Sequence, residues 1–247
     1  MSKVYFSKQI GNILDEIDFS KLGQKVAIKV HFGEKGCNTH LDPKLARAVY
    51  QKVEEAGKQP ALVECNVLYK GSRINSSKHI ETAKEHGFTE MKIDILDGEK
   101  GDEEIVIKGC KIGKGLEKYD SLIVLSHFKG HEATGFGGAI KNVGMGLGSR
   151  AGKLDMHSNV MPAVSSRCNG CGLCAEHCNV EAIKIVDGKA VIDEELCEGC
   201  AMCIAVCQNG GMQIPFGGRT AEELQKRVAE YSAAVLSLFS GAVYINV

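Results

Sequence analysis

The sequence lacks three features that would assign it to a large class of proteins at once. It has no excess of one charge sign, since its formal net charge is −1 at pH 7, and this argues against a nucleic-acid-binding surface. It has no apolar run of the ~20 residues that a membrane span needs, because the uncharged stretch 231–247 is interrupted by Ser240, Gly241 and Asn246. Charged residues run through the N-terminal region, where a signal peptide has its apolar core. We therefore expect no membrane span, no export and a cytoplasmic location.

The length and composition are those of a globular protein with an unusual supply of cysteine and glycine. At ~150 residues per domain, the 247 residues correspond to between one and two domains. Hydrophobic residues make up 44% and charged residues 25%, which excludes general disorder. The 11 cysteines are an odd number and too few for a small disulfide scaffold. In a chain that is not exported, we expect them to stay reduced and to bind metal.

Residues 1–126 alternate between strand and helix patterns. Apolar, β-branched runs predict strands at 25–30, 61–64, 91–96 and 121–126. Helices are predicted at 43–57, where Asp42 and Pro43 offer a start, and at 77–86. Residues 103–112 predict an added hairpin. The alternation indicates an α/β fold with a mainly parallel, Rossmann-like sheet and right-handed crossovers.

The chain is expected to divide into an α/β domain at 1–166, an inserted α+β unit at 167–214, and a returning segment at 215–247. The returning segment predicts an amphipathic helix at 219–239, with a capping box from Thr220 and Glu223, and then a strand that rejoins the first sheet. Because the sequence stops on an apolar strand without a polar tail, we expect it to be a fragment of a longer protein.

Eight of the cysteines form two blocks with the same spacing. CNGCGLCAEHC (168–178) and CEGCAMCIAVC (197–207) both follow C-x2-C-x2-C-x3-C, and each cysteine of the first recurs 29 residues later in the second. The unit resembles bacterial-type two-cluster ferredoxins, in which the fourth cysteine of each run binds the other cluster. We therefore expect two [4Fe–4S] clusters, one on Cys168, Cys171, Cys174 and Cys207 and the other on Cys197, Cys200, Cys203 and Cys178.

Structural zinc is the alternative for these cysteines, because C-x2-C pairs also form tetrahedral zinc sites. Zinc leaves the third cysteine and the repeated C-x3-C unexplained. One departure from the ferredoxin pattern is that the proline after the fourth cysteine is Asn179 in one block and Gln208 in the other. We expect a small change in loop rigidity or solvent access there, without loss of ligation.

Residues 168–207 carry seven acids and two lysines, a net charge of −5 that would steer the unit toward a basic partner.

A glycine-rich segment with several histidines forms a second candidate site. Eight of the 23 residues from 130 to 152 are glycine, which predicts a long loop with one helix from about Gly138. The segment follows a predicted strand, and ligands of open parallel sheets bind beyond the carboxyl ends of strands. We expect a crevice formed by His31, His40, His127, His131, His157, Lys141 and the glycines Gly137 and Gly138, whose N–H groups would face an anion. The alternative is that these are solvated loop histidines and tight turns.

The order of these segments resembles that of a known family. KVHFGEKGCNTHLDP, then SHFKGHEATGFGGAIKN with a later histidine, and then the two cysteine blocks are similar to the DUF362 family of iron–sulfur proteins, over nearly the whole chain. The resemblance implies an architecture and clusters more than a reaction.

A looser similarity to nickel-pincer lactate racemases lies in the order of His131, Gly137-Gly138, Lys141 and His157. In those enzymes the lysine tethers the cofactor, one histidine binds nickel and another moves a proton. Because the rest of their pattern is missing here, this similarity hints only at a shared ancestral site.

Three functions remain open from the sequence. The first is electron transfer through two [4Fe–4S] clusters, to or from a redox partner protein or a small-molecule substrate. The second is a redox or metal-assisted enzyme, an oxidoreductase fed by the clusters. Its catalytic residues would be His127, His131, Lys141 and His157, and its cofactor-binding residues Gly137, Gly138, His31 and His40. The third is a structural or redox-sensing role for the clusters.

Overall fold

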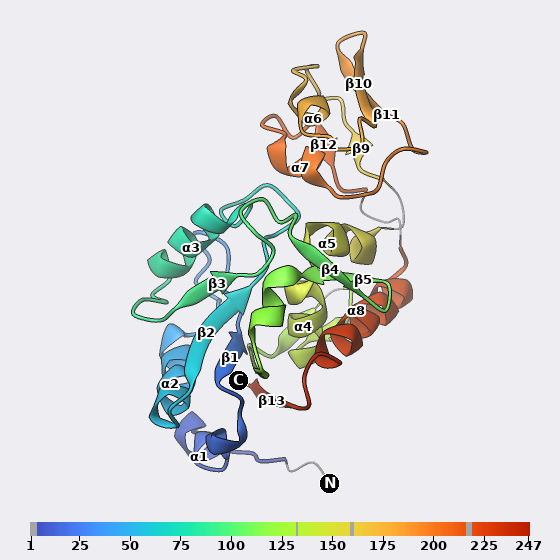
Figure 1. Ribbon diagram of the computed structural model, residues 1–247. Coiled ribbons are helices and arrows are strands. Elements are labelled where there is room, and N and C mark those ends of the chain that lie inside the picture. The colour runs from blue at the N-terminus through green and yellow to red at the C-terminus, as the bar shows by residue number, and fades with distance from the viewer. Residues whose placement is uncertain (1–3, 132, 159–160, 216–218) are drawn as a thin grey trace.

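A parallel sheet of five strands forms the centre of the larger part of the molecule (Figure 1). The computed structural model describes residues 4–131, 133–158, 161–215 and 219–247. The sheet has the order β13-β6-β1-β2-β3, and all of its neighbouring strands are parallel. Its strands are β1 (Lys25–Lys29), β2 (Gln59–Glu64), β3 (Ile93–Ile95), β6 (Ser121–Ser126) and β13 (Ala242–Asn246). Counted along the chain this is the order 5-4-1-2-3 of a doubly wound fold. The predicted parallel sheet, with the last strand returning to it, is confirmed.

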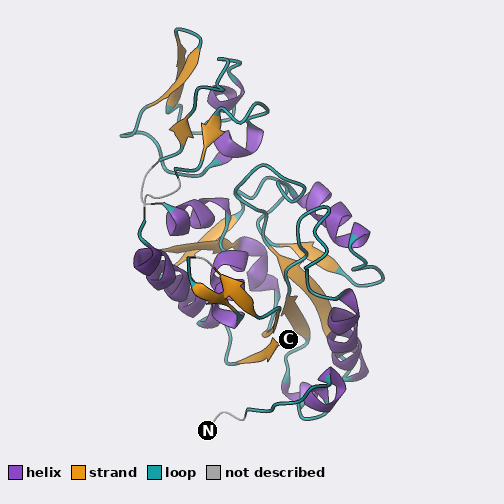
Figure 2. Cartoon of the chain, turned by 180° about the vertical axis from the view of Figure 1, so that it is seen from behind, coloured by secondary structure: helices purple, strands orange, loops and turns teal. Residues whose placement is uncertain are grey.

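Both faces of the sheet are covered, as expected for strands that are apolar on both sides (Figures 1 and 2). One core contains Ile28 and Leu62 and is closed by the helices α1 (Ile10–Leu14), α2 (Pro43–Glu55) and α3 (Ser76–Glu85). The other core contains Val63 and Val124. It is closed by α4 (Ala139–Leu147), α8 (Ala221–Leu236) and the antiparallel hairpin of β4 (Glu104–Ile107) and β5 (Cys110–Gly113). Short 3-10 helices span Phe19–Lys21 and Lys114–Lys118. No helix within the described ranges is both long and apolar enough to cross a membrane.

Local signals in the sequence begin the helices α2 and α8 as predicted. The Asp42 carboxylate accepts a hydrogen bond from the Lys44 N–H at 2.9 Å, directly before Pro43 in the first turn of α2. Thr220 and Glu223 form the reciprocal capping box of α8, at 2.8 and 3.2 Å. The predicted hairpin at 103–112 is present as β4 and β5.

The glycine-rich segment is more regular than the sequence suggested. The predicted helix from about Gly138 is confirmed as α4, whereas the prediction that the rest of the segment is a long loop is wrong. It holds the hairpin of β7 (Lys129–His131) and β8 (Gly135–Gly137), then α4, then α5 (Arg150–His157). Its glycines allow close packing. A Cβ atom on Gly144 would lie 2.2 Å from the carbonyl oxygen of Val228 in α8, and one on Gly152 would lie 2.2 Å from that of Lys111. Glycine is needed at these two positions because backbones meet there, and the segment remains helical.

The cysteine blocks belong to a small unit that lies above the sheet in Figure 1. Its elements are β9 (Ala163–Val164) paired with β12 (Met212–Gln213), the hairpin of β10 (Ile183–Val186) and β11 (Lys189–Ile192), and the helices α6 (Leu173–Glu176) and α7 (Met202–Val206). The β10–β11 hairpin turns at Asp187 and Gly188, which both have positive φ. The apolar core of the unit also contains Leu154 of α5 and Leu68, so the unit packs on the larger part of the molecule.

The 29-residue repeat of the sequence is also a repeat of backbone conformation. Left-handed residues occur at equivalent positions of the two blocks, in the pairs Gly170 and Gly199, Gly172 and Ala201, and Glu181 and Gly210. The helices α6 and α7 begin at equivalent residues, directly after the second of these pairs. The ferredoxin type of the unit and the three domain boundaries stay predictions.

Candidate functional site

A cavity of about 380 Å³ lies at the carboxyl ends of β1 and β6, the two adjacent strands from which the chain departs in opposite directions. This reversal opens a crevice in doubly wound folds. His31 lies just beyond β1 and His127 directly follows β6. The cavity is lined by all eight residues that the sequence assigned to a crevice, namely His31, His40, His127, His131, Gly137, Gly138, Lys141 and His157.

Helix α4 reaches the cavity with its amino end. Gly137 is the last residue of β8, directly before this helix, and Lys141 is in its first turn. Gly138 is the N-cap residue, and no side chain caps the helix. Lys141 is half-buried in the first turn. Burial and the neighbouring Lys129 ammonium lower the pKa of Lys141, because both disfavour its charged form.

Two histidines approach Lys141 from other elements. The Nδ1 atom of His131 accepts hydrogen bonds from the N–H groups of Ala133 and Thr134, both at 3.2 Å. In the neutral ring the proton is therefore on Nε2. His157 is the last residue of α5, and burial, with the charges of Lys141 and Lys153, lowers its pKa to about 4. The His157 ring is thus neutral at pH 7.

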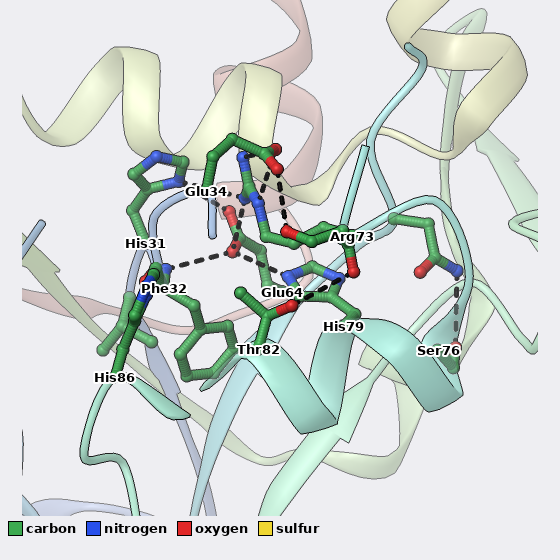
Figure 3. A network of polar contacts seen from close by, with 12 residues as sticks. His31, Phe32, Glu34, Glu64, Arg73, Ser76, His79, Thr82 and His86 are labelled. Atoms are coloured by element: carbon green, nitrogen blue, oxygen red, sulfur yellow. Dashed lines mark hydrogen bonds and ion pairs between the residues drawn. The ribbon is translucent and has the colours of Figure 1, made fainter. Parts of the chain in front are cut away.

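His40 and His31 also line the cavity, and both have polar partners. The His40 ring stacks on His86 with 4.3 Å between centroids, and its Nδ1 lies 2.8 Å from the Leu41 carbonyl oxygen. Nδ1 of His31 lies 3.1 Å from Oε1 of Glu64, a geometry in which Nδ1–H donates to the carboxylate (Figure 3). Burial lowers the pKa of His31 in spite of this carboxylate.

Glu64, the last residue of β2, holds together a charged network that the sequence reasoning missed (Figure 3). Its carboxylate lies 3.4 Å from the Lys29 ammonium and 3.2 Å from both the Arg73 guanidinium and the His79 ring. Burial alone would raise the pKa of Glu64, but Lys29, His31 and Arg73 hold it well below its usual range. His79 is fully buried beside Glu64 and does not line the cavity.

The Lys29 side chain packs against Gly146, a second glycine of α4. The lysine side chain is fully buried and donates to the Asn142 side chain at 2.8 Å. A Cβ atom on Gly146 would lie 2.4 Å from Cε of Lys29, so a larger residue there would displace the lysine. A lysine inside the apolar run of β1, and an acid at the end of β2, were the sequence signals for this network.

The cysteine unit holds a separate small cavity, of about 20 Å³, whose lining includes Cys168, Cys171, Cys174 and Cys207. These are the four residues that the sequence assigned to one cluster. Three sulfur atoms accept backbone N–H groups in the unit. The Cys178 Sγ accepts from Ala182 at 3.2 Å, the Cys207 Sγ accepts from Gly211 at 3.1 Å, and the Cys168 Sγ accepts from Ala190 at 3.3 Å. The first two bonds are equivalent in the repeat.

Electrostatic interactions also link cysteines of the second predicted set. Burial raises the pKa of the Cys200 thiol, and the charges of Cys178 and Cys197 act in the same direction. Within the described ranges, no group of three or more His, Cys, Asp or Glu side chains could hold a metal ion. In a [4Fe–4S] cluster each cysteine binds a different iron, so the sulfur atoms surround the cluster and do not converge on one ion.

Comparisons with known proteins identify a family and similar solved structures. The family model described as "Domain of unknown function (DUF362)" matches residues 26–247. The structure of the lactate racemase apoprotein from Thermoanaerobacterium thermosaccharolyticum is similar, with a TM-score of 0.41 and 10% sequence identity. The similarity covers 90% of this chain and 52% of that chain, so this chain spans about half the length of that protein. No curated protein matches the sequence.

Proposed function

The chain belongs to the DUF362 family, and we propose that it is an iron–sulfur protein that transfers electrons through two [4Fe–4S] clusters. One observation carries this proposal. Four cysteines that are far apart in two sequence blocks line the same small cavity, and they are the four that the ferredoxin-type spacing assigns to one cluster. The electrostatic interaction of Cys200 with Cys178 and Cys197 supports the assignment of the second cluster.

The chain supplies the surroundings that such clusters need. Iron binds cysteine as the thiolate, and backbone N–H groups aimed at sulfur stabilise that charge and tune the reduction potential. Hydrogen bonds from Ala190 and Gly170 lower the pKa of the Cys168 thiol. Electrons would pass to or from a partner protein or a small substrate, and the acidic surface of the unit favours a basic partner.

Anaerobic purification followed by iron and sulfide analysis and EPR tests this function. We expect about eight irons per chain, and fewer than about six, with zinc in their place, would refute the proposal. Two double variants test the crossed ligation. Cys171→Ala with Cys207→Ala removes two ligands of one cluster and should leave about four irons, whereas Cys171→Ala with Cys178→Ala removes one ligand of each cluster and should leave almost none. The opposite ranking would show that each block binds its own cluster.

The position of α5 favours a second function, an oxidoreductase whose site is the cavity at the ends of β1 and β6. Leu154 of this helix packs in the core of the cysteine unit, beside Cys174 and Cys203. Lys153 and His157 of the same helix line the cavity at the ends of β1 and β6. The variants His131→Asn and Lys141→Gln test this function. If they abolish turnover or ligand binding and leave the EPR signals unchanged, the cavity is the active site. If nothing changes, these side chains are structural.

A further inference from the structure

We propose that the cavity at the ends of β1 and β6 binds a small organic anion, whose carboxylate or phosphate group is held by Lys141, Lys153 and the amino end of α4. The inference rests on the second function above, in which this cavity is a ligand site, and does not depend on the iron–sulfur clusters.

The first argument is the balance of charge around the cavity. Among the described residues, Glu64 is the one carboxylate in the lining, and it is already paired with Lys29 and Arg73, at 3.4 and 3.2 Å. Three further cations line the cavity and form no ion pair with any described residue, namely Lys129, Lys141 and Lys153. Among the residues that the structure describes, the lining therefore holds more positive than negative charge.

The second argument is that two of these cations are withdrawn from solvent. Lys153 is 6% exposed, and its ammonium group donates to the Gly148 carbonyl oxygen at 2.6 Å. Lys141 is half-buried and makes no hydrogen bond or ion pair with the residues that the structure describes. Burial raises the pKa of Asp97 to about 6, and the Lys153 charge opposes that rise, so Lys153 has a carboxyl group nearby, whereas no carboxylate of the described residues acts on Lys141. A partly buried ammonium group without a counter-charge is unfavourable, and an anion in the cavity would supply that charge to Lys141.

The third argument is the direction of α4. Gly137 and Gly138 line the cavity, so the helix presents its amino end there, without a side-chain cap. The N–H groups of a first helical turn carry a partial positive charge and bind anions. The amino end of α4 and the two lysines are all positive, so all three attract an anionic ligand.

The remaining lining indicates an organic body in addition to the anionic group. Val67, Leu68 and Met145 form an apolar part of the wall. The cavity of about 380 Å³ has room for roughly a dozen waters at ~30 Å³ each. An inorganic ion alone would leave most of this space and its apolar wall without contact.

Calorimetric titration of the iron-loaded protein at low salt and pH 7 tests the inference. The probes are malonate, inorganic phosphate, and malonamide as an uncharged analogue of malonate. We expect malonate or phosphate to bind with a stoichiometry of one, to compete if both bind, and to weaken as KCl is added, whereas malonamide should not bind. Malonate alone would indicate a carboxylate ligand and phosphate alone a phosphate ester.

The Lys141→Gln variant should weaken binding at least ~10-fold, because it removes a charge-assisted hydrogen bond. The matched control is Lys92→Gln, in a separate lysine-lined cavity of about 420 Å³, which should leave affinity unchanged. The inference is overturned if neither anion binds, if malonamide binds as well as malonate, or if the two variants have the same effect. Iron and sulfide are measured on the same samples. Loss of anion binding with full iron refutes this inference alone, and anion binding without iron refutes the cluster proposal alone.

Discussion

Glu64→Gln is the change that most directly tests the charged network under the cavity. The Glu64 side chain is 4% exposed and faces the Lys29, His31, Arg73 and His79 side chains at 3.1 to 3.4 Å. Glutamine keeps the size of the side chain and removes its charge. The variant therefore leaves buried cations without a counter-charge and creates almost no cavity.

The size of the effect follows from the burial of these cations. Lys29 and Arg73 are 0% and 2% exposed, and breaking a buried ion pair costs about 3–5 kcal/mol. Arg73 keeps a second carboxylate partner, Glu34, at 2.8 Å. Most of the cost therefore comes from Lys29, which loses its ion-pair partner. At ~2–4 °C per kcal/mol for a chain of this size, Tm should fall by roughly 6–20 °C.

The pH dependence has a defined sign. Burial lowers the pKa of Lys29, and loss of Glu64 should lower it further. The unfolded chain then holds this proton up to pH ~10.4 while the folded chain releases it earlier, so the stability of the variant rises with pH. The difference in Tm between Glu64→Gln and the parent protein should therefore become smaller between pH 7 and pH 9.5.

Thermal unfolding followed by circular dichroism at these two pH values measures both effects. The matched control is Glu85→Gln, which breaks the Lys35–Glu85 pair of 2.8 Å at a site where Lys35 is 65% exposed, and it should lower Tm far less. The reasoning is refuted if the two variants differ by less than about 2 °C at pH 7, which is under ~1 kcal/mol. It is also refuted if the difference in Tm between Glu64→Gln and the parent protein grows at pH 9.5.

Two further predictions concern the glycine-rich segment. Gly144→Ala should destabilise the fold by ~1–3 kcal/mol in urea unfolding, because its Cβ would lie 2.2 Å from the Val228 carbonyl oxygen. Gly11→Ala, whose Cβ would meet nothing within 4 Å, should be neutral or slightly stabilising, and equal effects would contradict the packing argument. Lys141→Gln should raise the pKa of His157 from about 4, because burial and the Lys141 charge both disfavour the imidazolium. An NMR titration of the imidazole signals measures this shift, and an unchanged pKa would show that the lysine has no part in it.

The central sheet was predictable because its signals are local. The run SLIVLS is fully buried as β6, and its lack of polar alternation is what a strand covered on both faces requires. The return of the last strand was also predictable, since the capping box and the apolar face of α8 are both visible in the sequence. The position of the crevice followed from the rule for carboxyl ends of parallel strands.

The start of α4 near Gly138 was predicted, but its continuation through Gly144 and the second helix, α5, were not. Glycine is unfavourable within a helix, and only the proximity of α8 shows why Gly144 is there. The network of Glu64 was missed for a related reason. Lys29 and Glu64 come from neighbouring strands, but Arg73 comes from a loop, and its position beside Glu64 depends on tertiary structure. A lysine in a strand buried on both faces was nevertheless a signal, because a buried charge needs a partner.

The helix α5 connects the two candidate sites and bears on the choice between the proposed functions. Leu154 faces the core that contains Cys174 and Cys203, while Lys153 and His157, one helical turn apart, line the large cavity. A protein that only carries electrons between partners needs an exposed cluster and has no use for a cationic cavity behind it. An oxidoreductase needs both, with a short packed connection between them. The shared helix is therefore the observation that supports the second proposal, in which the cysteine unit would carry electrons to an organic anion in the cavity.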